Sequence, residues 1–457
     1  MRHVLISFLL YSSFVCAQTD DAAILNQGAT LSYALRDIQT GELIYRADEQ
    51  RLVPLASTQK LLTTSAAFHH LGADRTFKTR FYVNFSQSSG DTLHSDIVIR
   101  GGGDPTFSIE DLQAIASEIS KPYQAWDGKL LVDDRLFEKQ REAGTWPLED
   151  PGNYYGGGTH AFILAKNEYR VKAKASEVGS AIQILATEPE GLFTVFTSEA
   201  VAGPVGSGDK SFIYGWGDTK QRVLRGTLGA HKVHTIRGSI PNPTHYFAKQ
   251  FVAALNEAGM AVTQERIEPL DYLLDLPDSL VVESGKVSSI VQETNFKSDN
   301  LYAETLFKHL STSDGQATFS RSIEVIQDWL ADLIGQSNFV LYDGSGLSPN
   351  NVGTAQNYTR ALAAYTAFPW FPTFLQTIPV VGQTGTARYV RVAAKPAMTI
   401  YCKTGSIKGC RNLAGYIQTE KGMYTFFIGL SNYYTDTPSK YRLAEAVLQR
   451  MIKKIPL

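Results

Sequence analysis

The sequence contains little cysteine, little net charge and few long apolar runs. It has 3 cysteines in 457 residues, too few for a zinc cluster or a disulfide scaffold. The formal net charge is -2, so no polyanion partner is implied and we expect no nucleic-acid binding. Beyond the N-terminus no stretch reaches the ~18 apolar residues of a membrane-spanning helix. We therefore expect a soluble chain with several cores and at most peripheral membrane contact.

The N-terminus has the pattern of a secretory signal peptide. Arg2 and His3 precede an apolar run that ends in Val15-Cys16-Ala17, with small residues where a signal peptidase cleaves. We predict cleavage after Ala17, so that residues 1–17 are removed and the mature chain is exported. Lipid attachment at Cys16 is disfavoured, because the residues before it fit a lipobox poorly.

The two remaining cysteines, Cys402 and Cys410, lie on a predicted strand, turn and strand. An exported protein meets an oxidising environment. The sequence therefore leaves two alternatives open, a cross-strand disulfide or two buried free thiols.

Apolar periodicity divides the chain into three parts. Alternating residues predict a hairpin from Leu31–Arg36 and Glu42–Arg46, followed by a helix from Pro54 to about Leu71. Short β-like runs separated by Gly, Pro and Asn then fill residues 77–235, and Asn242-Pro243 opens a helix. The last third predicts helices at Ser322–Leu333, Ala355–Thr366 and the C-terminus, and strands at Met398–Lys403, Leu413–Ile417 and Tyr424–Leu430. We predict an α/β domain formed by residues 18–76 and 236–457, split by a mostly β insertion at 77–235 that can comprise two small modules.

The first chemical motif is Ser57-Thr58-Gln59-Lys60. Ser57 and Lys60 are one helical turn apart, so their side chains share a face, and Ser57 lies at a helix N-terminus that favours developing negative charge. A serine needs a base to become a nucleophile, and a lysine is a base only when burial or nearby positive charge makes it neutral. We predict that Ser57 is the nucleophile and Lys60 its base.

The second motif is Ser298-Asp299-Asn300, at the entrance to a predicted helix. Ser298 can relay a proton to a leaving amine, and the Asn300 amide can bind a substrate backbone. The same sequence also suits a helix N-cap, and the two roles are compatible.

The third motif, Lys403-Thr404-Gly405-Ser406, ends a strand. Gly405 lets an extended substrate approach the edge closely, while Lys403 and the hydroxyls of Thr404 and Ser406 suit a terminal carboxylate. The backbone N–H groups of Ser57 and Ser406 would form an oxyanion hole.

With all three motifs in this order, the chain resembles the low-molecular-mass class C penicillin-binding proteins, the D-Ala-D-Ala carboxypeptidase/endopeptidase family. Further signatures support the resemblance, namely Gly101-Gly102-Gly103-Asp104-Pro105 and Asp343-Gly344-Ser345-Gly346-Leu347-Ser348. The long separation of Ser57 from Ser298 is also similar to that family and differs from class A β-lactamases. The resemblance implies a split penicillin-binding/β-lactamase-like domain with an antiparallel sheet and helices.

The resemblance further implies an exported, periplasmic hydrolase that acylates Ser57 with peptidoglycan stem peptides and is inhibited by β-lactams. Relatives use an acidic residue in the insertion to hold the amine of a diamino acid; Asp150 occupies the expected place, with Tyr155 as its neighbour. Pro349 departs from the family, in which many members have Arg at this position, so the side-chain specificity is left open. So are the oligomeric state and the preference for carboxypeptidase or endopeptidase cleavage.

Two other functions are compatible with such a fold. A serine β-lactamase would need a water-activating group that we cannot assign, and a non-catalytic cell-wall or β-lactam-binding protein would not need three intact motifs. A phosphate loop at residues 203–211 is excluded by its spacing, and His231 and His234 would point to opposite faces of a strand. We expect no metal and no organic cofactor.

Overall fold

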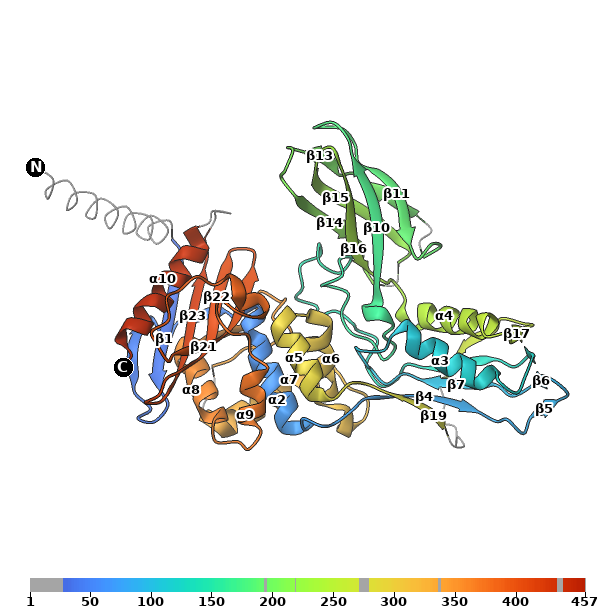
Figure 1. The fold of residues 1–457 in the computed structure, drawn as a ribbon, viewed down its shortest axis with the longest axis horizontal. Helices are drawn as coiled ribbons and strands as arrows, with labels where there is room; N and C mark the ends of the chain where they lie inside the picture. The colour runs from blue at the N-terminus through green and yellow to red at the C-terminus, as the bar shows by residue number, and fades with distance from the viewer. Residues whose placement is uncertain are drawn as a thin grey trace, which may run out of the picture. The chain divides into compact units, whose positions relative to one another are not determined.

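The computed structural model describes residues 28–456 except 193–194, 218, 271–278, 336–337 and 434–438. The predicted signal peptide, including Cys16, lies outside the described residues. The chain folds into two compact units (Figure 1). Unit 1 comprises residues up to His69, Val291–Ser298 and Ile323–Leu457, and unit 2 comprises His70–Ile290 and Asp299–Ser322.

Unit 1 is built on a five-stranded antiparallel sheet in the order β2-β1-β23-β22-β21 (Figure 1). The strands are β1 (Thr30–Asp37), β2 (Leu43–Ala47), β21 (Thr399–Ile407), β22 (Cys410–Gln418) and β23 (Met423–Ser431). The expected hairpin and the three expected closing strands are confirmed. Residues far apart in sequence therefore meet, because β1 pairs with β23 along its whole length.

Helices cover both faces of this sheet. Helix α10 (Ser439–Lys454) places Val447, Leu448 and Met451 in one core with alternate sheet residues such as Phe426 and Ile428. On the other face α8 (Ala355–Tyr365) packs Tyr358 against Phe427, with ring centroids 4.6 Å apart. The remaining elements assigned to unit 1 are β3 (Leu52–Pro54), η1 (Ala56–Thr58), α2 (Gln59–His70), β20 (Val352–Thr354), α9 (Phe371–Gln376) and η4 (Gly385–Tyr389), with parts of α5 (Val287–Lys297) and α7 (Phe319–Ile334).

The two cysteines lie on opposite faces of this sheet. Cys402 pairs in register with Gly415 and belongs to the core under α10, whereas Cys410 pairs with Ile407, and its thiol points toward the Pro54 carbonyl. Both are free, and burial raises the pKa of each thiol to about 12. Since alternate strand residues face opposite sides, the disulfide alternative is wrong.

The described residues of unit 2 form two large hydrophobic cores and a small third cluster of Tyr82, Val98, Leu131 and Leu270. In the first, α3 (Ile109–Ser120) and α4 (Pro243–Glu257) cover a sheet in the order β18-β9-β7-β4-β19. Its strands are β4 (Lys78–Val83), β7 (Ile97–Arg100), β9 (Leu130–Asp133), β18 (Ile267–Pro269) and β19 (Ser279–Glu283), and a small sheet adds β5 (Ser88–Ser89), β6 (Thr92–Leu93), β8 (Ala125–Trp126) and β17 (Ala261–Val262). Asn242 caps α4 as expected, while α3 was not foreseen, although Ser108 and Asp111 form a capping box at its start.

The second core lies between two all-β layers. One layer contains β10 (Glu168–Ala175), β11 (Gln183–Glu188) and β16 (Lys232–Ser239), and the other β12 (Val195–Ser198), β13 (Val201–Gly203), β14 (Asp209–Tyr214) and β15 (Gln221–Gly229). The bounds of unit 2 differ from those of the expected insertion. The unit extends beyond the expected insertion because α4 packs on α3, and because β18 and β19 pair with β9 and β4. It also takes in α6 (Asn300–His309).

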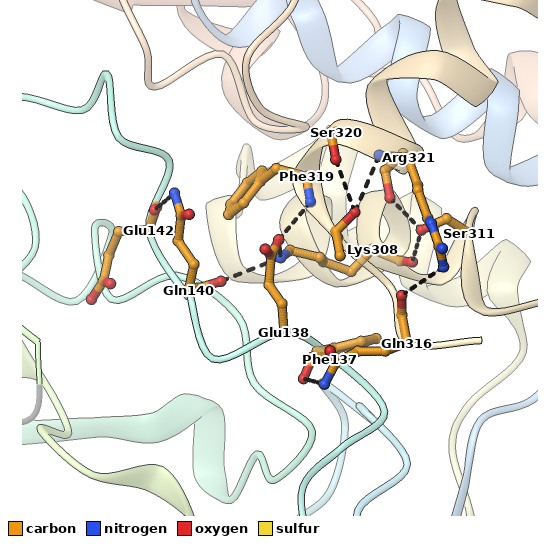
Figure 2. A network of polar contacts seen from close by, with 12 residues as sticks. Phe137, Glu138, Gln140, Glu142, Lys308, Ser311, Gln316, Phe319, Ser320 and Arg321 are labelled. Carbon is orange, nitrogen blue, oxygen red and sulfur yellow. Dashed lines mark hydrogen bonds and ion pairs between the residues drawn. The ribbon is translucent and has the colours of Figure 1, made fainter. Parts of the chain in front are cut away.

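A polar network fixes α6 within unit 2 (Figure 2). Lys308 on this helix is fully buried, and its ammonium forms an ion pair with Glu138. Glu138 also accepts a hydrogen bond from the Phe319 backbone, and Lys308 donates a further one, 3.3 Å long, to the Gln140 carbonyl. The charge buried at the end of α6 is thus neutralised by a loop more than 160 positions earlier in the chain.

Candidate active site

The predicted nucleophile follows a strained turn. Ala56 has φ +46°, a left-handed conformation that costs free energy in a residue other than glycine. The Asn412 side chain holds this turn by donating hydrogen bonds to the Pro54 and Leu55 carbonyls, at 2.7 and 2.8 Å. Ser57, half-buried, therefore lies in η1, directly before α2, where contacts from β22 hold it.

Lys60 is fully buried directly beneath Ser57. Its Nζ lies 3.1 Å from Ser57 Oγ and donates a 2.7 Å hydrogen bond to the Ser345 carbonyl. Asp343 orders the loop that carries this carbonyl, because its carboxylate accepts from the Gly346 N–H at 2.7 Å. Residues Asp343–Ser348 thus form an ordered loop that fixes the position of the Lys60 amine.

A second lysine and serine pair completes the cluster. Lys403 on β21 is also fully buried, and its Nζ donates to Ser298 Oγ at 2.9 Å and to the Thr404 carbonyl at 2.8 Å. Burial, followed by the charge of Lys60, lowers the pKa of Lys403 well below its ordinary value. The charges of Lys60 and Lys403 repel each other in this buried cluster, so protonation of both amines at once is disfavoured. The cluster therefore favours a state in which one lysine is neutral.

The third motif runs beside the nucleophile. A Cβ placed on Gly405 would lie 3.2 Å from the Ser57 backbone nitrogen, tighter than ordinary contacts, so a larger residue would push β21 away from the nucleophile by a few tenths of an ångström. Thr404 Oγ1 donates to Thr386 at 2.8 Å, and Ser406 is exposed.

Two polar neighbours of this strand were missed at the sequence level. Arg411 is the cross-strand partner of Ser406, and its Nη1 donates to Ser406 Oγ at 3.0 Å. Strand alternation could have found Arg411, since it faces the third motif across a predicted turn. Thr386 lies on a separate short turn, η4, and no local pattern links it to Thr404.

The remaining predicted site residues come together in unit 2. Asn300 opens α6 and donates through Nδ2 to the Tyr155 carbonyl at 2.9 Å, while the Tyr155 hydroxyl donates to Asp150 at 3.1 Å. Burial raises the pKa of Asp150 to about 6 against the opposing hydrogen bond from Tyr155. Asp299 caps α6 by accepting a hydrogen bond from the Tyr302 N–H, so the expected helix cap at the second motif is confirmed, while the catalytic role of the motif stays a prediction.

The described residues thus place the predicted site residues in two groups. Unit 1 joins Ser57, Lys60, Ser298 and Lys403, with Thr404, Gly405 and Ser406 on the strand of Lys403. Unit 2 joins Asn300, Tyr155 and Asp150. Within the described part of the chain, no three His, Cys, Asp or Glu residues are placed to hold a metal ion.

This fold and this site define a serine hydrolase of the penicillin-binding type, in which a buried lysine contacts a serine at a helix start beside a sheet edge. The chain belongs to the D-Ala-D-Ala carboxypeptidase 3 (S13) family, whose model matches residues 17–451. A D-alanyl-D-alanine carboxypeptidase of Actinomadura sp. (strain R39) is 29% identical over 423 residues, covering 88% of this chain and 78% of the relative.

Solved structures show the same fold. Penicillin-binding protein 4 (dacB) of Haemophilus influenzae superposes with a TM-score of 0.81 at 18% identity, covering 94% of this chain and 99% of the other. A predatory peptidoglycan endopeptidase of Bdellovibrio bacteriovorus superposes with a TM-score of 0.53 at 16% identity, covering 93% of each chain. The expected family and the expected fold class are therefore confirmed, and the chain is a serine-type D-Ala-D-Ala carboxypeptidase/endopeptidase.

Proposed function

We propose that Ser57 forms an acyl-enzyme with peptidoglycan stem peptides that end in D-Ala-D-Ala. The observation that carries this proposal is the 3.1 Å contact of the buried Lys60 amine with Ser57 Oγ. In its neutral form, Lys60 takes the proton of Ser57 as Oγ attacks the carbonyl of the penultimate D-alanine. The C–N bond then breaks, and Ser298 relays the proton held by Lys60 to the leaving amine, so that Lys60 is neutral again and Ser298 keeps its hydroxyl. Water hydrolyses the ester and regenerates Ser57.

The other motif residues bind the substrate in this proposal. The backbone N–H groups of Ser57 and Ser406 stabilise the oxyanion, and Thr404, Ser406 and Arg411 meet the terminal carboxylate. Asn300 holds the substrate backbone, and the carboxylate of Asp150 receives the ammonium of the diamino acid. The leaving group is a D-alanine in carboxypeptidase action or a cross-linked amine in endopeptidase action.

The proposed reaction belongs outside the cytoplasm, where peptidoglycan lies. The sequence pattern of residues 1–17 supports export to the periplasm by a cleaved signal peptide. No helix among the described residues has both the length and the apolar character needed to span a bilayer.

The test is acylation by a fluorescent penicillin, followed by intact mass measurement of the mature protein and of Ser57→Ala. We expect one adduct on the unmodified sequence and none on the variant. A pentapeptide ending in D-Ala-D-Ala should then release D-alanine only with the unmodified sequence.

Two outcomes would contradict the proposal. Drug hydrolysis without an adduct would indicate a β-lactamase. Intact drug and unmodified protein would indicate a binding protein without catalysis.

A further inference from the structure

A left-handed turn in unit 2 directly precedes β10. The three residues of this turn, η2 (Ala165–Asn167), all have positive φ, +49° at Ala165, +62° at Lys166 and +51° at Asn167. None of them is a glycine, so each costs free energy in this conformation. Strain of this kind persists only where the surrounding structure imposes it, and it is concentrated at residues with a function. Lys166 is the central residue of the turn.

Hydrogen bonds from Asn167 hold the turn in this conformation. Its Oδ1 accepts from the Leu164 N–H at 3.0 Å, and its Nδ2 donates to the Phe162 carbonyl at 3.0 Å. The Asn167 carbonyl in turn accepts from the Ile240 N–H at 2.8 Å. The backbone on both sides of Lys166 is therefore fixed within unit 2.

The Lys166 side chain reaches the second motif. Its Nζ donates to Asp299 Oδ2 at 2.8 Å, while Asp299 Oδ1 accepts from the Tyr302 N–H at 3.2 Å. The same ammonium lies 4.6 Å from the centroid of the Tyr302 ring, a cation–π contact. The ion pair is partly shielded from water, because the two side chains are 31% and 17% exposed. Lys166 thus holds the first turn of α6 at two points, a carboxylate and a ring.

Asn300 belongs to this same first turn. It is the first residue of α6, between the capping Asp299 and Tyr302, and its Nδ2 donates to the Tyr155 carbonyl at 2.9 Å. Helix ends fray more readily than helix interiors. The position of the Asn300 amide therefore depends on the contacts that keep the first turn of α6 closed.

A second ion pair adjoins the first. Glu168, two residues after Lys166, pairs with Arg237 at 3.2 Å, and the Arg237 guanidinium lies 3.6 Å from the centroid of the Tyr154 ring. Burial raises the pKa of Glu168. The charge of Arg237 opposes this shift, as does that of Lys166, whereas Asp299 adds to it. The two cations and the two carboxylates therefore form one electrostatic cluster, whose formal charges cancel.

We propose that Lys166 is a positioning residue for the substrate-binding amide of Asn300. It acts through Asp299, because their ion pair fixes the first turn of α6 and so holds Asn300 Nδ2 where the backbone of the stem peptide binds. The proposal rests on the proposed function for the role of Asn300. In it Lys166 contacts neither the substrate nor the nucleophile, so its loss weakens substrate binding and leaves the chemical steps intact.

The test is the steady-state release of D-alanine from a pentapeptide that ends in D-Ala-D-Ala. Lys166→Met should raise KM about fivefold or more and leave kcat within about twofold. Lys166→Arg should restore most of the lost affinity, because it retains the positive charge. Lys172→Met is the matched control, since Lys172 on β10 forms an exposed ion pair with Glu188. It should leave both constants within about twofold.

A double-mutant cycle tests whether Lys166 acts through Asp299. Asp299→Asn removes the charge but keeps an oxygen that can cap the helix. It should raise KM by about the same factor as Lys166→Met. In the Asp299→Asn background, Lys166→Met should then change KM by less than about twofold.

Three kinetic results would overturn the proposal, namely an unchanged KM in Lys166→Met, independent and additive effects in the double variant, or a lower melting temperature without a change in KM. The last result would assign Lys166 a structural role alone. If the unmodified sequence releases no D-alanine, the proposed function fails, and hydrogen exchange of the Tyr302 amide decides about Lys166. Exchange should be about fivefold faster or more in Lys166→Met if the ion pair fixes the first turn, and equal exchange would contradict it.

Discussion

Burial and neighbouring groups determine whether Lys60 and Lys403 are charged or neutral. An exposed lysine is charged at neutral pH and cannot act as a base. Here both side chains are fully buried, and each amine contacts a serine hydroxyl, at 3.1 Å for Lys60 and 2.9 Å for Lys403. In the proposed reaction, the reactivity of Ser57 would therefore depend on two lysines that lie more than 340 residues apart in the sequence.

Replacing Lys60 by methionine tests this dependence. Lys60→Met keeps the buried volume but removes the base, so we expect the rate of acylation by benzylpenicillin to fall by about 10²–10⁴-fold. Stopped-flow or quenched mass measurement gives this rate. Lys408→Met, at an exposed turn, is the matched control and should remain within about twofold. An unchanged rate in Lys60→Met would show that another group takes the proton.

We predict that the buried carboxylate of Asp150 lowers the stability of the protein at neutral pH while it contributes to substrate binding. Its pKa is raised to about 6 in the folded protein from an ordinary 3.8, so the folded state binds the proton more tightly than the unfolded state. The free energy of unfolding therefore falls as pH rises from about 4 to 6, and the cost is complete above pH 6. Asp150→Asn should stabilise the protein at pH 7, on the order of 1–3 kcal/mol, and remove this pH dependence.

Urea unfolding at pH 4 and pH 7 measures this effect, and turnover of a peptide with a diamino acid measures the functional cost. We expect kcat/KM to fall in Asp150→Asn although stability rises. Glu149→Gln, an exposed neighbour, should change stability little. If Asp150→Asn is less stable than the unmodified protein at pH 7, neighbouring groups must compensate the cost of burying the Asp150 charge.

At the scale of the elements, the turn before α2 and the loop before β20 fit together through one glycine. Gly346 has φ +78°, and a Cβ placed there would lie 1.9 Å from the Ala56 carbonyl oxygen. No rigid backbone can accommodate that distance, so the loop that supports Lys60 would have to move.

Gly346→Ala should therefore destabilise the protein by about 3 kcal/mol and slow acylation. Gly335→Ala is the control, since its φ is +75° but nothing lies within 4 Å of its Cβ position. It should cost only the ~1 kcal/mol of a left-handed alanine. Thermal unfolding compares the stability of the two variants. Equal losses of stability would mean that the loop before β20 moves without an additional cost in free energy.

The elements of the central sheet were predictable because each carries its own pattern. The hairpin, the closing strands and the Asn242 cap follow from alternation and from helix-start signals. The pairing register of β1 with β23 was not predictable from the sequence, because the pairing of strands so far apart in the chain depends on the whole core. For the same reason Thr386 was missed, whereas Arg411 is only five positions from its partner Ser406 and was within reach of strand alternation. Ser57, Lys60, Ser298 and Lys403 were proposed from short motifs.

At the scale of the whole molecule, the buried ion pair in Figure 2 makes α6 depend on a distant loop. Burial lowers the pKa of Lys308 in opposition to Glu138, so the charged form needs this partner. Glu138→Gln should cost about 3 kcal/mol by removing the ion-pair partner of the buried ammonium, which Glu304 replaces only in part. Adding Lys308→Met to that variant should recover part of the loss.

Urea unfolding of the single and double variants gives the comparison. A further loss in the double variant would show that Lys308 contributes mainly through its other contacts. Acylation by penicillin should persist in both variants below their unfolding temperatures, because neither residue belongs to the serine and lysine cluster.

The chain passes between its two units four times, and one of these passages falls inside the Ser298-Asp299-Asn300 motif. The consequence is evolutionary and practical. A domain encoded as one continuous segment can be lost, duplicated or transplanted by a single recombination event, but neither unit of this protein is continuous. Deleting residues 70–290 would remove Glu138 and Tyr155, the partners of Lys308 and Asn300, while leaving α6 in place. The two units must therefore be inherited together, and a gene fragment that carries only the motif-bearing segments would not yield a smaller working enzyme.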